Sequence, residues 1–301
     1  MQTQFGPLAA VFMFLIAVES AVVGAPVAVV NHGFEDISGE SPFNEFTFGP
    51  LNGWDLYDPG VITDGGDGPV YYIGTLTPFE PDPVGQPGVF ANFDDGAAEG
   101  QRVAIAFNFA GSGDDGEYGL EQTLVAILGA NMVYTLDVEI GNIASATAMS
   151  GQFFDLDGFP GYRVELLAGG VVIASDDNSL AGLIPEGDFA TSTTAVTIGD
   201  SHPQLGQVLS IRLINLNQVD PMFPGANLEV DFDDVRLDAS PAPVACPGDI
   251  DSNNTVDVDD LNAILSAFNT AVAPGSALDL ANNDGFVDVD DLNVVLSNWG
   301  Q

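Results

Sequence analysis

Apolar and polar residues alternate through most of the chain between Val27 and Leu237, and Gly, Pro, Asn and Asp interrupt the alternation. Segments 103–109 and 134–140 show the pattern clearly. Because successive side chains of a strand point to opposite faces, the alternation predicts half-buried β-strands. No helical period separates them, and about eight short strands with turn signals predict an antiparallel β-sandwich of the jelly-roll type.

The last predicted strand changes its parity. The apolar residues of segment 228–232 lie on one face, whereas those of segment 235–237 have the opposite parity, which predicts a β-bulge at Asp233-Asp234. The bulge turns one carboxylate toward the interior or the sheet edge, where it needs a cation or several hydrogen-bond donors. The candidate partners of this carboxylate are the side chain of Arg236 and a calcium ion that the carboxylate shares with Glu35.

The last 55 or so residues follow a different pattern. The string VDVDDLN stands at 256–262 and again at 287–293, and apolar residues at i, i+3, i+4 and i+7 follow each copy. This spacing predicts two amphipathic helices whose apolar stripes face each other. The stripes consist of Leu261, Ile264, Leu265 and Phe268, and of Leu292, Val295, Leu296 and Trp299. Three prolines before the first copy exclude an incoming helix, so the predicted unit is loop then helix, twice.

The first loop, 249–260, has oxygen-bearing residues at positions 1, 3, 5, 7, 9 and 12, which is the spacing of a calcium loop. The predicted ligands are the side chains of Asp249, Asp251, Asn253, Asp257 and Asp260 and the carbonyl of Thr255. Val256, at position 8, is expected to pair with the second loop as a short strand.

The second loop departs from this register. Counting back from Asp291 puts Leu280 at position 1, and Leu280 cannot bind calcium. Asp279 can take that place only if the loop contains one extra residue. The expected ligands are Asp279, Asn282 or its neighbour Asn283, Asp284, Asp288 and Asp291. The alternative is a solvated acidic tail, which the exact repetition disfavours.

With these loops, Cys246–Gln301 resembles the type I dockerins. The resemblance implies a small all-α pair of calcium loop-helix units and, as partner, a cohesin-like domain or a cell-surface protein. The positions that carry a hydroxyl pair in cellulosomal members are Val258-Asp259 and Val289-Asp290 here, so such a partner would have to recognise different chemistry.

Segment 29–239 resembles the galactose-binding-like β-sandwiches, which include many carbohydrate-binding modules. The motifs are Asn31–Glu35, Gly53-Trp54, Leu120–Leu124 and Asp233–Val235. The resemblance implies a structural calcium ion held by Glu35 and by Asp233 or Asp234, and a polysaccharide as ligand.

Sugar-binding sites stack aromatic rings on the apolar faces of pyranoses. Trp54, Tyr71 and Tyr72 are the predicted ligand-binding residues, all near the Gly/Pro-rich stretch 56–99. Because neighbours on a strand face opposite ways, one ring of the Tyr71-Tyr72 pair is expected to be exposed. The alternative is that these rings belong to the core.

Charge and composition narrow the choice of partners. The formal charge is −40, with 44 acidic residues against four arginines, so no basic surface can neutralise phosphates. Nucleic acid and anionic membrane surfaces are therefore excluded as partners. Cys246 is the only cysteine, which excludes an intrachain disulfide and leaves calcium (Ca²⁺) as the expected cofactor that stabilises the small C-terminal unit.

The expected domain organisation follows from these patterns. An apolar run at 8–18 predicts a secretory signal peptide at 1–25, with a membrane anchor as the alternative, and hence an extracellular protein, either secreted or attached to the cell surface. The β-sandwich is expected at 27–238, a Pro/Ala linker at 239–247 and the dockerin-like calcium-binding domain at 248–301.

The favoured function is therefore that of a secreted modular protein that binds polysaccharide and docks through its C-terminal module. No catalytic residue is assigned, because 44 acidic residues guarantee carboxylate pairs at glycosidase spacing by chance. Glu121 and Glu165 are the least generic candidates. The alternatives are a glycoside hydrolase or polysaccharide lyase, and a structural or adhesion protein without a sugar ligand.

Overall fold

The computed structural model describes residues 24–38, 45–68, 70–78, 92–93, 95–111, 116–148, 150–242, 246–273, 276–282 and 284–301. The chain divides into two compact units, Met1–Ser240 and Pro241–Gln301. The expected signal peptide lies almost entirely outside the described residues, as do residues 243–245 of the expected linker. No helix in the described ranges is long and apolar enough to cross a membrane.

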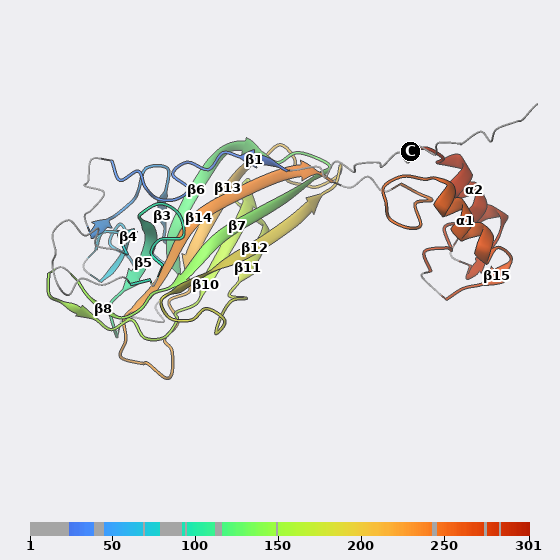
Figure 1. Cartoon of the computed structure of the whole chain (residues 1–301). Coiled ribbons are helices and arrows are strands. Elements are labelled where there is room, and N and C mark those ends of the chain that lie inside the picture. Colours follow the sequence, from blue (N-terminus) through green and yellow to red (C-terminus); the bar gives the residue numbers. More distant parts are fainter. Residues whose placement is uncertain are drawn as a thin grey trace, which may run out of the picture. The chain divides into compact units, whose positions relative to one another are not determined.

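The first unit contains a seven-stranded antiparallel sheet (Figure 1). Its strand order is β12-β7-β14-β5-β4-β2, and β1 also pairs with β14. The bounds are β1 Ala25–Val27, β2 Phe46–Phe48, β4 Tyr71–Leu76, β5 Val103–Asn108, β7 Met132–Asn142, β12 Asp188–Ile198 and β14 Leu228–Pro241. The Gly/Pro-rich stretch 56–99 thus contributes β4, an inner strand of this sheet.

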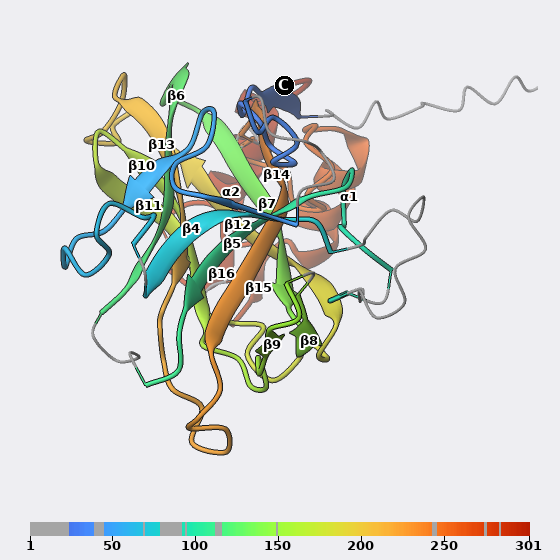
Figure 2. The ribbon, with the colours of Figure 1, turned by 90° about the vertical axis from the view of Figure 1, so that its left-hand side faces the viewer.

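A five-stranded antiparallel sheet, in the order β11-β10-β13-β6-β3, completes the sandwich (Figure 2). The bounds are β3 Asp55–Tyr57, β6 Tyr118–Ile127, β10 Tyr162–Ala168, β11 Val171–Asp177 and β13 Val208–Asn215. A hairpin at Gly169-Gly170 joins β10 to β11, and both glycines have positive φ. The mainly β sandwich is confirmed, and its jelly-roll connectivity stays a prediction.

Successive side chains of a strand point to opposite faces of the seven-stranded sheet, so its apolar side chains belong to two separate clusters. Ala104 and Ala106 of β5 belong to the core shared by the two sheets. The larger residues of the same strand, Val103, Ile105 and Phe107, belong to a second cluster on the other face of the seven-stranded sheet. Strand β5 is therefore buried on both faces, and the prediction that it is half-buried is wrong, because the sheet is covered on its outer face as well.

The predicted bulge in β14 is confirmed. Asp234 has a φ of 46°, a left-handed conformation that breaks the strand alternation. As a result Val230, Phe232, Val235 and Leu237 all join the core between the sheets despite their opposite parities.

The second unit contains two helices, α1 Val258–Ala267 and α2 Val289–Ser297, and a two-stranded ladder of β15 Thr270–Ala271 with β16 Phe286–Val287. Asp257 and Asp288 cap the two helices with the same capping box. The helices follow their loops as predicted. The unit is not the all-α pair that the dockerin resemblance implied, because it includes a β ladder.

Two details of this unit differ from the predictions. Val256 does not pair with the second loop. Its backbone instead bonds with Gly300 and Gln301, while Val287 pairs with the segment after α1. The apolar stripes also face each other only in part. Ile264 and Val295 are fully buried, but the far ends of both stripes are exposed at Leu265, Phe268, Leu296 and Trp299.

Candidate functional site

The candidate site lies on the outer face of the seven-stranded sheet. Tyr72 on β4 and Glu229 on β14 each stand opposite Phe107 on β5, so the three residues form one row across three strands. Residues that pair across neighbouring strands point to the same face. The rings of Tyr72 and Phe107 stack with their centroids 4.7 Å apart.

Two short elements border this row. The hairpin of β8 Ala146–Thr147 with β9 Phe153–Phe154 packs against it, and β2, the edge strand of the same sheet, lies beside β4. Phe154 meets the ring of Phe107 edge to face at 5.7 Å, and Phe46 lies 6.2 Å from Phe154. The aromatic rings therefore form the walls of an enclosed site.

The space consists of a narrow chamber and an outer vestibule. The chamber has a volume of about 20 Å³, enough for about one water molecule, and the vestibule, which opens to solvent, has about 490 Å³. Phe46, Tyr72 and Phe154 line both spaces, whereas Glu229 lines the chamber alone. The vestibule has the size of a small-molecule site, and the narrow chamber at its inner end places the carboxyl of Glu229 beyond it.

Glu229 is the chemically distinctive group in this chamber. Its side chain is buried, and its Oε1 atom has no hydrogen-bond partner within the described part of the chain. Burial raises the pKa of Glu229 to about 8, because the apolar surroundings destabilise the charged form. The carboxyl is therefore predominantly protonated at neutral pH and can donate a proton or a hydrogen bond.

A second buried carboxyl follows on the same face of β14. Both oxygens of Asp231 are buried without a hydrogen-bond partner among the described residues. Burial and the charge of Glu229 raise its pKa well above the ordinary value. Asp231 does not line the chamber, whereas Glu229 lines it at the inner end and Glu45 lines both the chamber and the vestibule.

Only one of the three predicted aromatic ligand residues reaches this site. Tyr72 lines the chamber, whereas Tyr71 packs edge to face on Tyr118 in the core between the sheets. Trp54 is completely buried, donates through Nε1 to the carbonyl of Asn31 and lies 5.4 Å from the ring of Phe34. The prediction of an exposed tyrosine ring is wrong, since β4 is covered on both faces.

Glu121 and Glu165 lie on the five-stranded sheet, outside the residues that line the chamber, and each is paired. Glu121 accepts from Arg212 at 2.6 Å. Glu165 accepts from Arg163 at 2.8 Å and from Arg212 at 3.3 Å. Ion pairing accounts for both residues, and neither has a role in the site.

Three carboxylates converge near the bulge of β14. Asp233 accepts from the backbone N–H of Glu99 at 2.7 Å, and Glu35 accepts from Gln101 and Arg102 at 2.6 and 2.7 Å. Burial raises the pKa of Asp233 to about 8, and the charges of Glu99 and Glu35 add to the increase. Asp234 turns away and pairs with Arg236.

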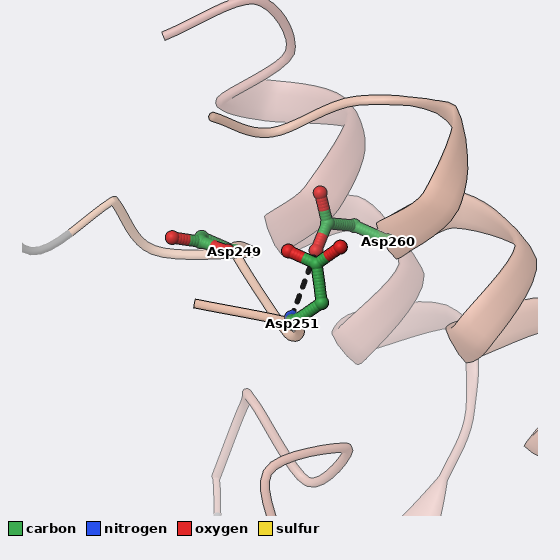
Figure 3. A group of neighbouring side chains, drawn as sticks. All are labelled: Asp249, Asp251 and Asp260. Atoms are coloured by element: carbon green, nitrogen blue, oxygen red, sulfur yellow. Dashed lines mark hydrogen bonds between the residues drawn. The ribbon is translucent and has the colours of Figure 1, made fainter. Parts of the chain in front are cut away.

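In the C-terminal unit, the structure brings Asp249, Asp251 and Asp260 together, each offering one oxygen within 4.8 Å of the others (Figure 3). Asn253 and Thr255 lie in the same loop, where the Asn253 side chain accepts from the Thr255 N–H, and Asp257 caps α1. In the second loop, Asp279 and Asp291 lie at its two ends, Asp288 caps α2, and Asn282 and Asp284 lie between them.

The first unit is thus a β-sandwich with an aromatic-lined pocket on the outer face of one sheet and a buried carboxyl at the inner end of that pocket. Residues 25–238 match the family model of the HpiC1-like proteins, described as HpiC1 cyclase. The chain belongs to this cyclase family. No curated protein matches the sequence significantly.

Solved structures of related cyclases come from Fischerella sp. TAU. The Stig cyclase Fisc, in complex with (3Z)-3-(1-methyl-2-pyrrolidinylidene)-3H-indole, is 36% identical, with a TM-score of 0.60 over 73% of this chain and 100% of its own. A cyclase in complex with 4-(1H-indol-3-yl)butan-2-one is 37% identical, with a TM-score of 0.58 over 72% of this chain and 98% of its own.

These findings correct the function expected from the sequence. The family match replaces both the dockerin identification and the carbohydrate-binding module, and the predicted polysaccharide-binding function is wrong. The preference for a non-enzyme, with a glycosidase as the enzymatic option, is also wrong because the family is one of cyclases. The short motifs that suggested a sugar-binding module belong to the sandwich scaffold and carry no information about its ligand.

Sequence reasoning missed Glu229, Phe107 and Phe154. The available signal was in β14, where Glu229, Asp231 and Asp233 alternate with apolar residues. Alternating acids normally mark a solvated face. The burial of Glu229 involves the hairpin β8–β9 and Phe46 of β2, which are distant from it in sequence.

Proposed function

We propose that this protein is a cyclase that closes a ring on an indole-bearing substrate, with Glu229 as the general acid. The observation that carries the proposal is the buried carboxyl of Glu229, whose Oε1 atom has no hydrogen-bond partner among the described residues, at the inner end of an aromatic-lined pocket. The indole compounds bound to the Fischerella cyclases supply the substrate class.

The vestibule suits a planar aromatic ring. It has a volume of about 490 Å³ and is lined by Phe46, Tyr72 and Phe154, and Phe107 lines the chamber beyond it. Aromatic faces bind flat apolar groups and stabilise positive charge that develops on them. A cation that forms during ring closure would therefore be more stable in this pocket than in water.

Glu229 supplies the proton in this scheme. The neutral carboxyl donates a proton to the bound substrate, whose unsaturated side chain then becomes electrophilic toward the aromatic ring. A carbon–carbon bond forms as the π electrons of the ring attack, and the loss of a proton from the ring carbon to the carboxylate of Glu229 restores the acid. The proton count is unchanged, and the reaction is an isomerisation.

Turnover of an indole that carries an unsaturated side chain, followed by mass spectrometry and NMR, tests the proposal. The expected product has the mass of the substrate and one additional ring. Equal turnover by wild type and Glu229→Gln would show that the proposal is wrong.

We also propose that Ca²⁺ binds where Glu35, Glu99 and Asp233 converge. Gly33 and Gly100 allow this approach, because a Cβ at either glycine would collide with the carboxylate of Glu99 or Glu35. Three clustered carboxylates favour a hard cation. Loss of calcium-dependent thermal stabilisation in Asp233→Asn, but not in Asp36→Asn, would support the assignment.

A further inference from the structure

A second cavity lies in the first unit, apart from the chamber and its vestibule. It has a volume of about 490 Å³, and no described residue that lines it also lines either of those two spaces. Its walls are formed by Asn142, the last residue of β7, and by the loops 155–161, 178–187 and 216–227. Loops that a rigid sandwich holds together in this way commonly carry binding sites.

Hydrogen bonds join these wall segments to one another. The N–H of Gly187 donates to the carbonyl of Asn142 at 2.7 Å, which connects loop 178–187 to β7. The side chain of Asn178 accepts from the first backbone N–H of β10 at 3.2 Å. The N–H groups of Leu216 and Gln218 each donate to a carbonyl of loop 155–161 at 3.1 Å. Because the walls are connected, the cavity is already formed before a ligand binds.

Asn142 presents a hydrogen-bond acceptor without a donor at this cavity. Its Nδ2 atom donates to the carbonyl of Ile184 at 3.0 Å, which fixes the orientation of the amide. Its Oδ1 atom is buried and has no hydrogen-bond partner among the described residues. A buried acceptor without a donor is costly, and an N–H group of a ligand would remove that cost.

The charged side chains that line the cavity are both carboxylates, Glu186 and Asp220. All four arginines and both histidines belong to the described part of the chain, and none of them lines the cavity. Gly158 leaves room for one of the carboxylates, since a Cβ at this glycine would lie 2.9 Å from the Cβ of Asp220. Two carboxylates without a cationic neighbour favour a positively charged ligand.

Two aromatic rings provide an apolar surface in the same cavity. The ring of Phe159 meets that of Tyr162 edge to face at 6.2 Å, and Phe223 is 39% exposed. Aromatic rings bind flat apolar groups, and their faces attract organic cations. A volume of about 490 Å³ is that of a site for a small organic molecule, which is far larger than a bare metal ion.

We propose that this cavity is a second ligand site, which binds an organic ammonium ion with an aromatic body. Glu186 and Asp220 supply the negative charge, Asn142 supplies an acceptor for an N–H group, and the two phenylalanines supply the apolar surface. The preference for a cation distinguishes this site from the chamber, where the carboxyl of Glu229 is predominantly protonated at neutral pH. The site does not depend on the cyclisation chemistry proposed above.

Calorimetric titration of the full chain with 2-phenylethylamine and with 2-phenylethanol tests this proposal. The two probes have nearly the same shape, but only the amine carries a positive charge at neutral pH. Wild type should bind the amine at least about tenfold more tightly than the alcohol, because a charge-assisted hydrogen bond is stronger than a neutral one. Equal affinity for the two probes, or binding of neither, would overturn the proposal.

Variants of the wall residues locate the binding. Asp220→Asn and Glu186→Gln should each weaken binding of the amine by about fivefold, the effect of one partly exposed charge pair, and should leave binding of the alcohol unchanged. The matched control is Asp200→Asn, which removes the same charge from an exposed side chain in the turn after β12. Glu229→Gln, in the chamber, should also leave binding of the amine unchanged.

Two further outcomes would contradict the assignment. Weakening of the amine by Asp200→Asn to the same extent as by Asp220→Asn would show that the amine responds only to the overall charge of the protein. Loss of the amine in Glu229→Gln would place it in the chamber. The comparison of amine with alcohol needs wild type alone, so the proposal stays testable if a variant fails to fold.

Discussion

Tyr72 and Glu229 stand on either side of Phe107 in one row across β4, β5 and β14. Strands in a sheet are about 4.8 Å apart, so the two residues are separated by about 10 Å at the backbone. A planar ring that stacks near Tyr72 can therefore extend toward Glu229 across the surface of Phe107. This arrangement separates binding of the ring from proton donation, and it allows the two roles to be tested by different variants.

Glu229→Gln should lower kcat by about 10²- to 10⁴-fold, the range expected when a general acid is removed. KM should change little, because glutamine keeps the shape of the side chain. Glu121→Gln provides the matched control, since it makes the same change on the other sheet, at a residue paired with Arg212. Steady-state kinetics with both variants would distinguish loss of the acid from a general effect of removing charge.

The stability of the first unit should fall as pH rises. Glu229 has an ordinary pKa of 4.5 and a folded-state pKa of about 8, so the folded state binds the proton more tightly than the unfolded chain does. Its contribution is fully present below about pH 4.5, decreases through neutral pH and is lost above about pH 8. Thermal unfolding at a series of pH values should show a smaller decline for Glu229→Gln than for wild type. Identical slopes would contradict the raised pKa.

Tyr72 should act through its ring and not through its hydroxyl. Tyr72→Phe keeps the stacking on Phe107 and should retain most of the activity, whereas Tyr72→Ala should raise KM for an indole substrate and destabilise the fold by about 3–5 kcal/mol. Binding of 4-(1H-indol-3-yl)butan-2-one, measured by calorimetry below the unfolding temperature of each variant, provides the readout. Equal weakening by both substitutions would assign the role to the hydroxyl.

The two faces of the sheet explain which features the sequence could predict. Local alternation was sufficient to predict the strands, and the parity change at Asp233-Asp234 was sufficient to predict the bulge. The alternation of residues alone does not show which face of β5 points into the core between the two sheets. The small residues Ala104 and Ala106 face the other sheet, and the large residue Phe107 faces the chamber.

The chamber itself depends on contacts between segments far apart in the chain. Phe46, Phe107 and Phe154 come from β2, β5 and β9, and the folded sandwich with the hairpin β8–β9 brings their rings together. Sequence patterns report burial within one segment and give no information on such a covering element. The burial of Glu229, and with it the raised pKa on which the proposed chemistry depends, could therefore not be predicted.

Trp54 provides a test of a purely structural role for an aromatic residue expected to bind a ligand. Its side chain is completely buried, so Trp54→Ala should lower the free energy of unfolding by about 3–5 kcal/mol. Trp54→Phe should cost less, although it loses the hydrogen bond to Asn31. Below the unfolding temperature, KM of the folded fraction should equal that of wild type. A raised KM with unchanged stability would instead place Trp54 in the binding site.

Glu165 pairs with two arginines on the five-stranded sheet. The effects of substitutions in this network on the free energy of unfolding should be non-additive. Its carboxylate is only 8% exposed and accepts from both Arg163 and Arg212. Arg212→Met leaves Glu165 with one partner and should destabilise the protein by about 1–3 kcal/mol. Combination with Glu165→Gln should cost less than the sum of the two single changes, since the second substitution removes the carboxylate that the first left poorly paired. Urea denaturation of wild type, both single variants and the double variant gives the coupling energy, and strict additivity would show that the two side chains act independently.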